Sequence, residues 1–140
     1  MKIMAIDYGD AHTGVAISDR TGTLCGYSTV VTAYTPEAVL KRLQAVVAEH
    51  EVTELVLGHP INMDGTRGVR AEKAEAFAEQ LRAATGLPVT LWDERRTTID
   101  AHNILAANGK RAKERKKTVD AVAAALLLEG YLTYKKKNGG

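Results

Sequence analysis

The sequence predicts an α/β protein with a mixed five-stranded sheet: three antiparallel strands followed by two parallel ones, with helices on both faces. The first third of the chain contains three β-type segments joined by short, turn-rich connections, which favour antiparallel neighbours. The middle alternates β-type segments with segments of helical periodicity, as strand–helix units do. Neither an internal repeat nor a linker interrupts the 140 residues, so we expect a single domain over residues 1–140.

The first three predicted strands cover residues 3–6, 15–17 and 24–31. Residues 3–6 are apolar at consecutive positions, so this strand should be covered on both faces and lie centrally in the sheet. The turn-rich residues 9–14 and the turn signal Asp-Arg-Thr-Gly at residues 19–22 separate the three strands.

Two strand–helix units are expected next. Pro36 indicates a helix start, because proline is favoured in the first turn, and helical spacing then continues to about residue 50. Residues 55–57 form the fourth predicted strand, and residues 89–92 form the fifth. Between them, Gly86 is placed to end a helix. The apolar face of that helix is predicted from Ala71, Ala74, Phe77, Ala78 and Leu81.

The last third of the chain predicts two helices. Thr97 and Asp100 have the spacing of a capping box, so the first helix should begin there and run to about residue 108. Thr118 can cap the second helix, which we expect to extend over residues 119–134. Because this stretch is apolar around most of its circumference, the helix should be buried.

The formal net charge of +2 conceals an asymmetry. Residues 110–117, expected as a loop, hold six basic residues and one acidic residue, and residues 135–140, expected as a disordered tail, hold three lysines. Since the whole chain has 19 basic and 17 acidic residues, the remainder has 10 and 16. Clustered basic charge beside acidic sites suits a polyanion that is bound electrostatically and cut at a cation-filled centre. A solvated loop and a frayed terminus are the alternative.

Composition excludes several classes of protein. The hydrophobic content of 45% is that of a globular chain. No apolar run approaches the roughly 20 residues that a membrane-spanning helix needs, and no signal peptide is recognisable, so we expect a cytoplasmic protein. The single Cys25 excludes an intramolecular disulfide and a cysteine-rich metal site.

Three acidic residues, Asp7, Glu94 and Asp120, are the candidate metal ligands. Asp7 and Glu94 each follow a predicted strand, and the C-terminal ends of parallel strands meet at one edge of a sheet. Asp120 opens the last predicted helix and joins them only if that helix begins over the same edge. Converging carboxylates suit a hard divalent cation. The alternatives are a turn cap for Asp7 and a favourable helix N-terminal charge for Asp120.

Five motifs in the same order resemble one known family. They are Asp7-Tyr8-Gly9, residues 14–19, Gly58-His59-Pro60 with residues 62–65, residues 93–98 and residues 117–124. Together they resemble the YqgF family of pre-16S rRNA nucleases, formerly described as Holliday junction resolvases, over about residues 2–134. The resemblance implies a ribonuclease H-like fold and a bacterial cytoplasmic nuclease that acts in 5′-end maturation of 16S rRNA. It also implies that Asp7, Glu94 and Asp120 hold the metal.

The residues around Glu94 are candidate substrate contacts. Asp93 and Glu94 are adjacent, so in a strand they point to opposite faces and only one readily faces Asp7; the resemblance favours Glu94. Arg95 and Arg96 follow directly, and arginine can bind a phosphate through two hydrogen bonds. Alternatively, one of these arginines pairs with a neighbouring aspartate.

Further candidate substrate contacts lie near the other motifs. Gly9 and Gly58 either let a phosphate approach closely or supply turn geometry. The family usually has arginine where His12 stands and an apolar residue where His59 stands, so the sequence departs from the family pattern at both positions. His12 is either a substrate contact or an ordinary surface residue. The basic candidates are Lys113, Arg115, Lys116 and Lys117.

The favoured activity is metal-dependent hydrolysis of phosphodiester bonds. Mg²⁺ or Mn²⁺ held by the three acids would activate a water for in-line attack at phosphorus and stabilise the leaving oxygen. Pre-rRNA is the favoured substrate because of the resemblance, and branched DNA is the alternative. The residues by themselves distinguish neither RNA from DNA nor endonuclease from exonuclease, and they leave monomer and homodimer open.

Two non-nuclease readings remain. An Asp-x-Gly followed by a β-turn-β unit also resembles the first phosphate loop of actin-like ATPases and sugar kinases, which favours an ATP-binding module. A non-catalytic nucleic-acid-binding or ribosome-assembly module that uses residues 110–117 is the second.

Overall fold

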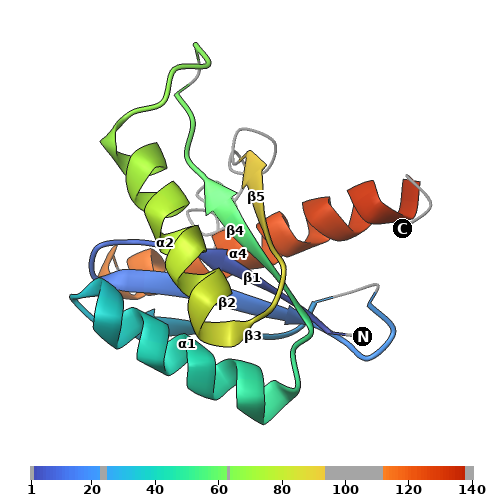
Figure 1. Cartoon of the computed structure of the whole chain (residues 1–140). Helices are drawn as coiled ribbons and strands as arrows, with labels where there is room; N and C mark the ends of the chain where they lie inside the picture. The colour runs from blue at the N-terminus through green and yellow to red at the C-terminus, as the bar shows by residue number, and fades with distance from the viewer. Residues whose placement is uncertain (1, 23–24, 63, 94–111, 138–140) are drawn as a thin grey trace.

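The computed structural model describes residues 2–22, 25–62, 64–93 and 112–137, and for residues 112–120 it describes the backbone only (Figure 1). Within this part of the chain five strands form one sheet: β1 (Ile3–Asp7), β2 (His12–Ser18), β3 (Cys25–Thr32), β4 (Glu54–His59) and β5 (Val89–Asp93). Their order across the sheet is β3-β2-β1-β4-β5. β1, β2 and β3 pair antiparallel, whereas β1, β4 and β5 are parallel. The predicted mixed sheet is confirmed.

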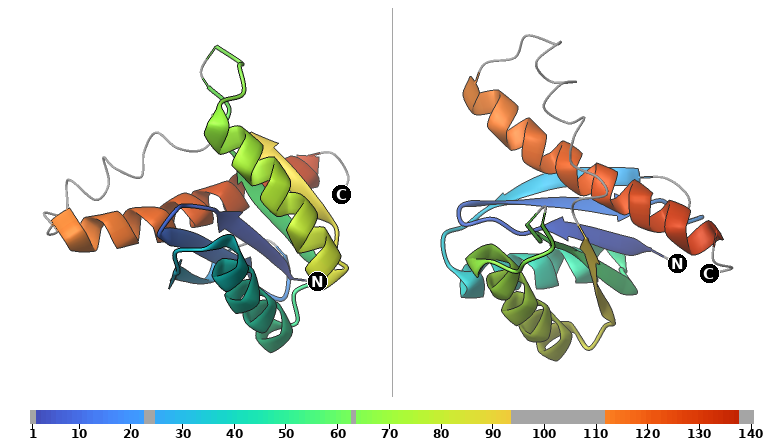
Figure 2. Two further views of the ribbon diagram at one scale, coloured as in Figure 1. Left: turned by 60° about the vertical axis from the view of Figure 1, so that its left-hand side comes forward. Right: turned by 90° about the horizontal axis from the view of Figure 1, so that it is seen from above.

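Three helices pack against this sheet in the described residues: α1 (Pro36–His50), α2 (Val69–Thr85) and α4 (Ala112–Lys137). The helices α1 and α2 cover one face and α4 crosses the other, so the sheet is covered on both sides as expected (Figure 2). None of these helices is apolar over enough length to cross a membrane.

β1 is buried on both sides because its side chains alternate between two cores. Met4 and Ile6 belong to the core beneath α1 and α2, whereas Ile3 and Ala5 belong to the core beneath α4. All four side chains are at most 1% exposed. The consecutive apolar residues therefore predicted the central strand correctly.

The ends of α1 and α2 follow the local signals in the sequence. The Thr35 hydroxyl accepts a hydrogen bond from the Ala38 N–H at 3.2 Å, and Pro36 is the first helical residue of α1. Gly86 ends α2 with a φ of 70°, a left-handed conformation that glycine adopts readily, and its N–H donates to the Arg82 carbonyl.

The start of α4 differs from the prediction. The helix begins at Ala112 rather than after Thr118, so residues 112–117 are helical and Asp120 lies in the third turn. Lys, Arg, Glu and Ala are strong helix formers, and their propensity continues the helix through the position expected as a cap. The proposed helix N-terminal charge of Asp120 is therefore wrong.

The end of α4 also differs from the prediction. We expected a disordered tail over residues 135–140, but the helix continues to Lys137. Lys135 Nζ lies 2.8 Å from Glu54 Oε1 at the start of β4, and both side chains are mostly buried, which fixes the last turns of α4 on the sheet. The helix expected over residues 97–108 lies outside the described residues.

Candidate active site

The C-terminal ends of the three parallel strands form one edge of the sheet. β4 lies between β1 and β5, with Ile6 opposite Leu57 and His59 opposite Asp93. Asp7 ends β1 one residue beyond Ile6. Two acidic residues, Asp7 and Asp93, therefore flank the end of β4. The sequence predicted this arrangement for Asp7 and Glu94, and Glu94 lies outside the described residues.

Strand alternation determines which face of the sheet each acidic residue occupies. Asp7 continues the alternation of Ile3 and Ala5, so it lies on the α4 face. Its side chain is half-buried, and within the described residues its carboxylate makes no hydrogen bond or ion pair. A half-buried carboxylate without such a partner is costly. This acceptor-only oxygen pair is a chemically suitable ligand for a hard divalent cation.

Asp93 lies on the opposite face from Asp7. Val89 belongs to the core beneath α1 and α2, and Trp92 belongs to the core beneath α4, so alternation returns Asp93 to the α1/α2 side. Asp93 therefore does not face Asp7.

Several predicted site residues fall outside the described part of the chain. Glu94, Arg95 and Arg96 are among them, and the side chain of Asp120 is not described. No group of three His, Cys, Asp or Glu residues is arranged to hold a metal among the described side chains, a set that includes Asp7 but not the other two predicted ligands. The basic candidates occupy the first turns of α4, which extend beyond the sheet (Figure 2); they are Lys113, Arg115, Lys116 and Lys117.

The two candidate glycines have different structural roles. A Cβ at Gly9 would lie 2.4 Å from the His12 carbonyl oxygen, so the tight turn after β1 requires glycine. Gly58 follows Val56 on the α4 face, the face of Asp7, and presents no side chain there. His12 begins β2, and its Nδ1 lies 3.3 Å from Thr32 Oγ1. Of these residues, Gly58 is the one that lies on the same face as Asp7.

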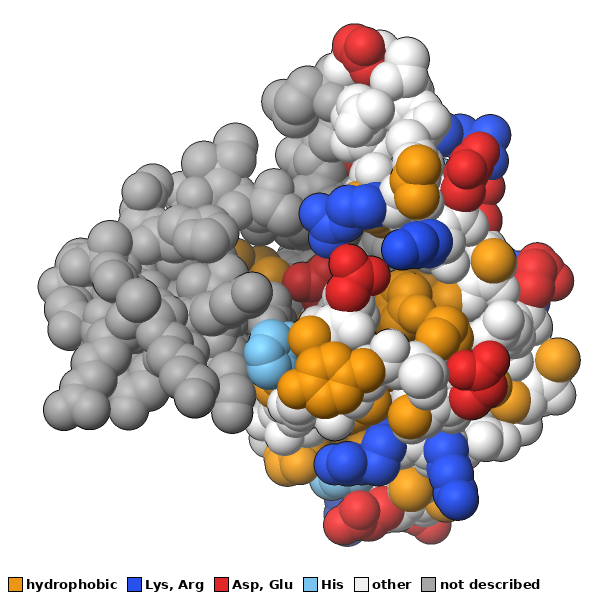
Figure 3. Space-filling model, turned by 90° about the vertical axis from the view of Figure 1, so that its left-hand side faces the viewer, with side chains coloured by type: hydrophobic (Ala, Val, Ile, Leu, Met, Phe, Trp, Pro, Cys, Tyr) orange, Lys and Arg blue, Asp and Glu red, His pale blue; other side chains and the backbone are white. Residues whose placement is uncertain are grey.

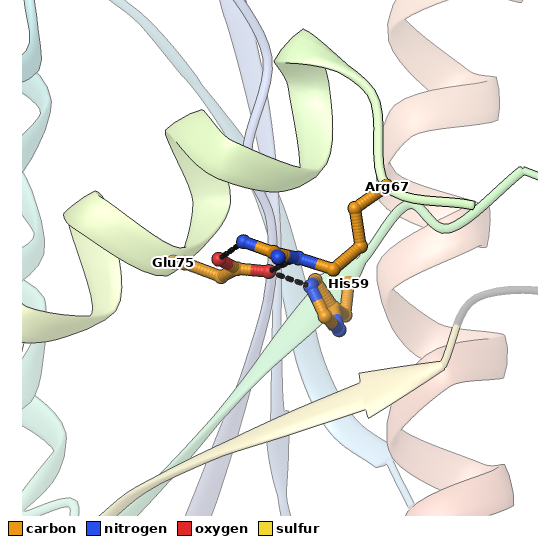
Figure 4. Close-up of polar contacts among 3 residues, drawn as sticks. All are labelled: His59, Arg67 and Glu75. Carbon is orange, nitrogen blue, oxygen red and sulfur yellow. Dashed lines mark hydrogen bonds and ion pairs between the residues drawn. The ribbon is translucent and has the colours of Figure 1, made fainter. Parts of the chain in front are cut away.

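His59 belongs to a polar cluster that the sequence did not predict. Its Nε2 lies 2.7 Å from Glu75 Oε2, and Arg67 binds both carboxylate oxygens of Glu75 (Figure 4). The hydrogen bonds from Arg67, and then that from His59, hold the pKa of Glu75 below its usual range. The cluster attaches the loop after β4 to α2. The three residues come from a strand end, a loop and a helix, so their spacing in the sequence follows no helical or strand period and does not predict the cluster.

Known proteins resemble this chain over nearly its whole length. The family model described as "RuvX: Holliday junction resolvase" matches residues 1–134. A protein of Halothermothrix orenii named "Putative pre-16S rRNA nuclease" is 41% identical over 140 residues and is covered, like this chain, over 100% of its length. A protein of the same name from Desulfitobacterium hafniense (strain DSM 10664 / DCB-2) is 44% identical over 141 residues, with 99% of this chain and 97% of the relative covered.

Solved structures share the fold. The Thermus thermophilus RuvC in complex with a Holliday junction substrate superposes with a TM-score of 0.63 at 15% identity, covering 98% of this chain and 96% of RuvC. The predicted ribonuclease H-like fold is thereby confirmed. A ROK hexokinase from Thermus thermophilus matches with a TM-score of 0.50 at 22% identity, covering 74% of this chain and 38% of the hexokinase.

Proposed function

This chain belongs to the RuvX family, also called YqgF, and from that premise we propose that it is a metal-dependent nuclease that processes the 5′ end of pre-16S rRNA in the cytoplasm. The relatives that share about two fifths of its residues over its full length are named for that activity. Family membership also confirms the resemblance carried by the five sequence motifs.

The observation that carries the proposal is the position of Asp7. Its half-buried carboxylate ends the central strand on the α4 face, with no hydrogen-bond or ion-pair partner among the described residues. We infer that a divalent cation supplies the missing positive charge, since desolvating a carboxylate without one is unfavourable.

Glu94 is the second ligand in this proposal. Asp93 lies on the α1/α2 side of the sheet, and successive strand residues point to opposite faces. The position after Asp93 is therefore the one that alternation assigns to the face of Asp7. This parity supports the choice of Glu94 over its neighbour.

Asp120 is the third ligand in this proposal. Its position along α4, compared with the position of Asp7 along β1, supports this choice. Tyr131 of α4 donates a hydrogen bond to Glu54, which is the register partner of Ile3. Position 120 precedes Tyr131 by eleven residues, about 16 Å along a helix, and Asp7 follows Ile3 by four residues, about 13 Å along a strand. Because α4 runs back over the sheet in the direction opposite to β1 (Figure 2), the two positions reach a similar level.

The chain's own groups would act by holding and positioning. A bound Mg²⁺ or Mn²⁺ would activate water and stabilise charge at phosphorus. The three carboxylates would fix that ion at the sheet edge, and Gly58 would leave room for the scissile phosphate. The basic first turns of α4 would attract the RNA backbone.

A matched pair of variants tests the proposal. The assay uses a pre-16S rRNA 5′ leader with Mg²⁺ or Mn²⁺. We expect the Asp7→Asn variant to bind this RNA but to cleave it much more slowly. The loss should exceed the roughly 10–100-fold that is typical when a residue that only supports a metal ligand is removed. Asp93→Asn, the control on the opposite face, should retain cleavage. Cleavage by Asp7→Asn at the wild-type rate would exclude the proposed centre.

A Holliday junction resolvase is the second candidate, because the family model carries that description and the RuvC structure shares the fold. The same assay with a four-way DNA junction distinguishes the two. Preferential, Asp7-dependent cleavage of the junction over the RNA leader would favour resolution of branched DNA.

A further inference from the structure

A cavity of about 280 Å³ opens on the α1/α2 side, beside the turn that follows β1. A smaller one of about 80 Å³ shares part of its lining and adds Arg70 and Pro60. The larger cavity is just below the roughly 300–1,000 Å³ of typical small-molecule sites, so it suits a single planar ring system. Its main lining residues are Tyr8, Asp10, Tyr34, Lys73, Phe77 and Gln80.

Aromatic side chains provide the apolar surface of this cavity. The rings of Tyr8 and Phe77 stack nearly parallel, with centroids 4.1 Å apart, and Phe77 is buried in the core. Tyr34, at the entrance to α1, is 76% exposed although it lines the cavity. A buried pair of stacked rings with an exposed ring beside it is an arrangement on which a nucleobase can stack.

Polar groups border the aromatic surface. Lys73 Nζ lies 3.6 Å from Asp10 Oδ1, and both side chains are largely exposed, so this ion pair is weak. Arg70 makes no ion pair or hydrogen bond within the described residues. Figure 3 shows the corresponding face, where hydrophobic side chains lie between basic and acidic ones. Two cations beside an apolar hollow fit a base attached to phosphates.

The cavity lies immediately next to the proposed catalytic residue. Tyr8 follows Asp7 directly, but its side chain belongs to the α1/α2 side, whereas Asp7 lies on the α4 side. Consecutive Cα atoms are only about 3.8 Å apart. A nucleic-acid strand with a phosphate at Asp7 can therefore cross the sheet edge and place a neighbouring base on the other face.

We propose that this cavity receives one unpaired base of the strand that is cut at Asp7, with the adjoining phosphates against Lys73 and Arg70. The proposal rests on the proposed nuclease function and specifies its substrate: the strand must be single-stranded beside the scissile bond, because a base inside a duplex is paired and stacked.

The test measures RNA binding in an Asp7→Asn background, which separates binding from cleavage. The probe is a single-stranded leader RNA with 2-aminopurine beside the cleavage site, compared with the same RNA annealed to its complement. We expect Tyr34→Ala to weaken single-strand binding about 5- to 150-fold, the range for losing one base–aromatic stack, and to reduce 2-aminopurine quenching. Lys73→Gln should weaken binding with a smaller salt dependence.

Tyr27→Ala is the matched control, because Tyr27 is also an exposed tyrosine but lies on β3 and packs against His50. It should bind as the parent does. If Tyr34→Ala and Lys73→Gln bind the single strand like the parent, or lose single-strand and duplex affinity equally, the cavity proposal is overturned. If the Asp7→Asn protein cleaves normally, the proposed function itself fails, so the two failures are distinguishable.

Discussion

At the residue scale, the strand alternation at one edge separates groups with different roles. Asp7 and Gly58 lie on the α4 face, whereas Tyr8, His59 and Asp93 lie on the α1/α2 face. The first face holds the proposed metal ligand and a glycine beside it. The second holds the aromatic cavity and the cluster centred on Glu75. Asp7 and Tyr8 point to opposite faces and both lie at the start of the turn between β1 and β2. The geometry of this turn therefore affects the position of both side chains.

Gly9→Ala should destabilise the protein by about 1–3 kcal/mol, the usual cost of forcing extra volume into a packed site. The added Cβ would lie 2.4 Å from the His12 carbonyl oxygen, which is backbone and cannot rotate away. Urea denaturation measures the change. Gly68→Ala is the control, because the nearest atom to its Cβ would be a side-chain atom of Asn62 at 3.6 Å. Equal small effects at both positions would show that the turn relaxes.

At the element scale, α4 combines two functions in one helix. Its C-terminal half is anchored on the sheet by Leu127 and Leu128 in the core and by Lys135 on Glu54. Its first turns extend beyond the sheet and carry Lys113, Arg115, Lys116 and Lys117 (Figure 2). A continuous helix therefore connects the anchored half to a basic arm, which we expect to bind the RNA backbone.

Replacing Lys113, Arg115, Lys116 and Lys117 by glutamine should weaken RNA binding and flatten its salt dependence. The logarithm of the affinity falls as the logarithm of the salt concentration rises. Each lost phosphate contact makes this fall less steep, by about 0.7 in slope for a single strand. Glutamine preserves helix propensity, so the helix itself is retained. Replacing Lys136 and Lys137 at the other end of α4 is the matched control. An unchanged slope in the first variant would exclude a role for this arm.

At the scale of the whole molecule, the sheet order β3-β2-β1-β4-β5 brings distant segments to a single edge. The central position of β1 and the parallel pairing of β4 and β5 place the ends of three strands side by side. The same topology occurs in the hexokinase domain that superposes on this chain, so the fold alone does not distinguish a nuclease from a nucleotide-binding module.

Thermal shift distinguishes these two activities in the intact protein. A short single-stranded RNA with Mg²⁺ at 100 times its Kd should stabilise the fold by about 2.7 kcal/mol and raise Tm accordingly. ATP with Mg²⁺ at the same concentration should raise Tm much less, because one nucleotide makes only part of the contacts proposed for an RNA strand. A saturable increase in Tm with ATP would instead support the ATP-binding reading.

The sequence by itself determined the central strand and most of the described elements. The consecutive apolar residues 3–6, Pro36 at the start of α1 and Gly86 at the end of α2 are local signals, and all were correct. The start of α4 was predicted wrongly, because helix propensity on both sides of Thr118 outweighed its capping tendency. Neither the capping tendency of Thr118 nor the helix propensity of its neighbours is enough by itself to predict where the helix begins.

Only the tertiary structure decided which side chains meet. The Arg67–Glu75–His59 cluster and the cavity beside Tyr8 each join separate elements, and their spacing in the chain has no period that a sequence pattern could reveal. The face on which Asp93 lies likewise depends on the register of β5 against β4. Local propensity acts within a few residues, whereas these contacts depend on how the whole sheet brings its strands and helices together.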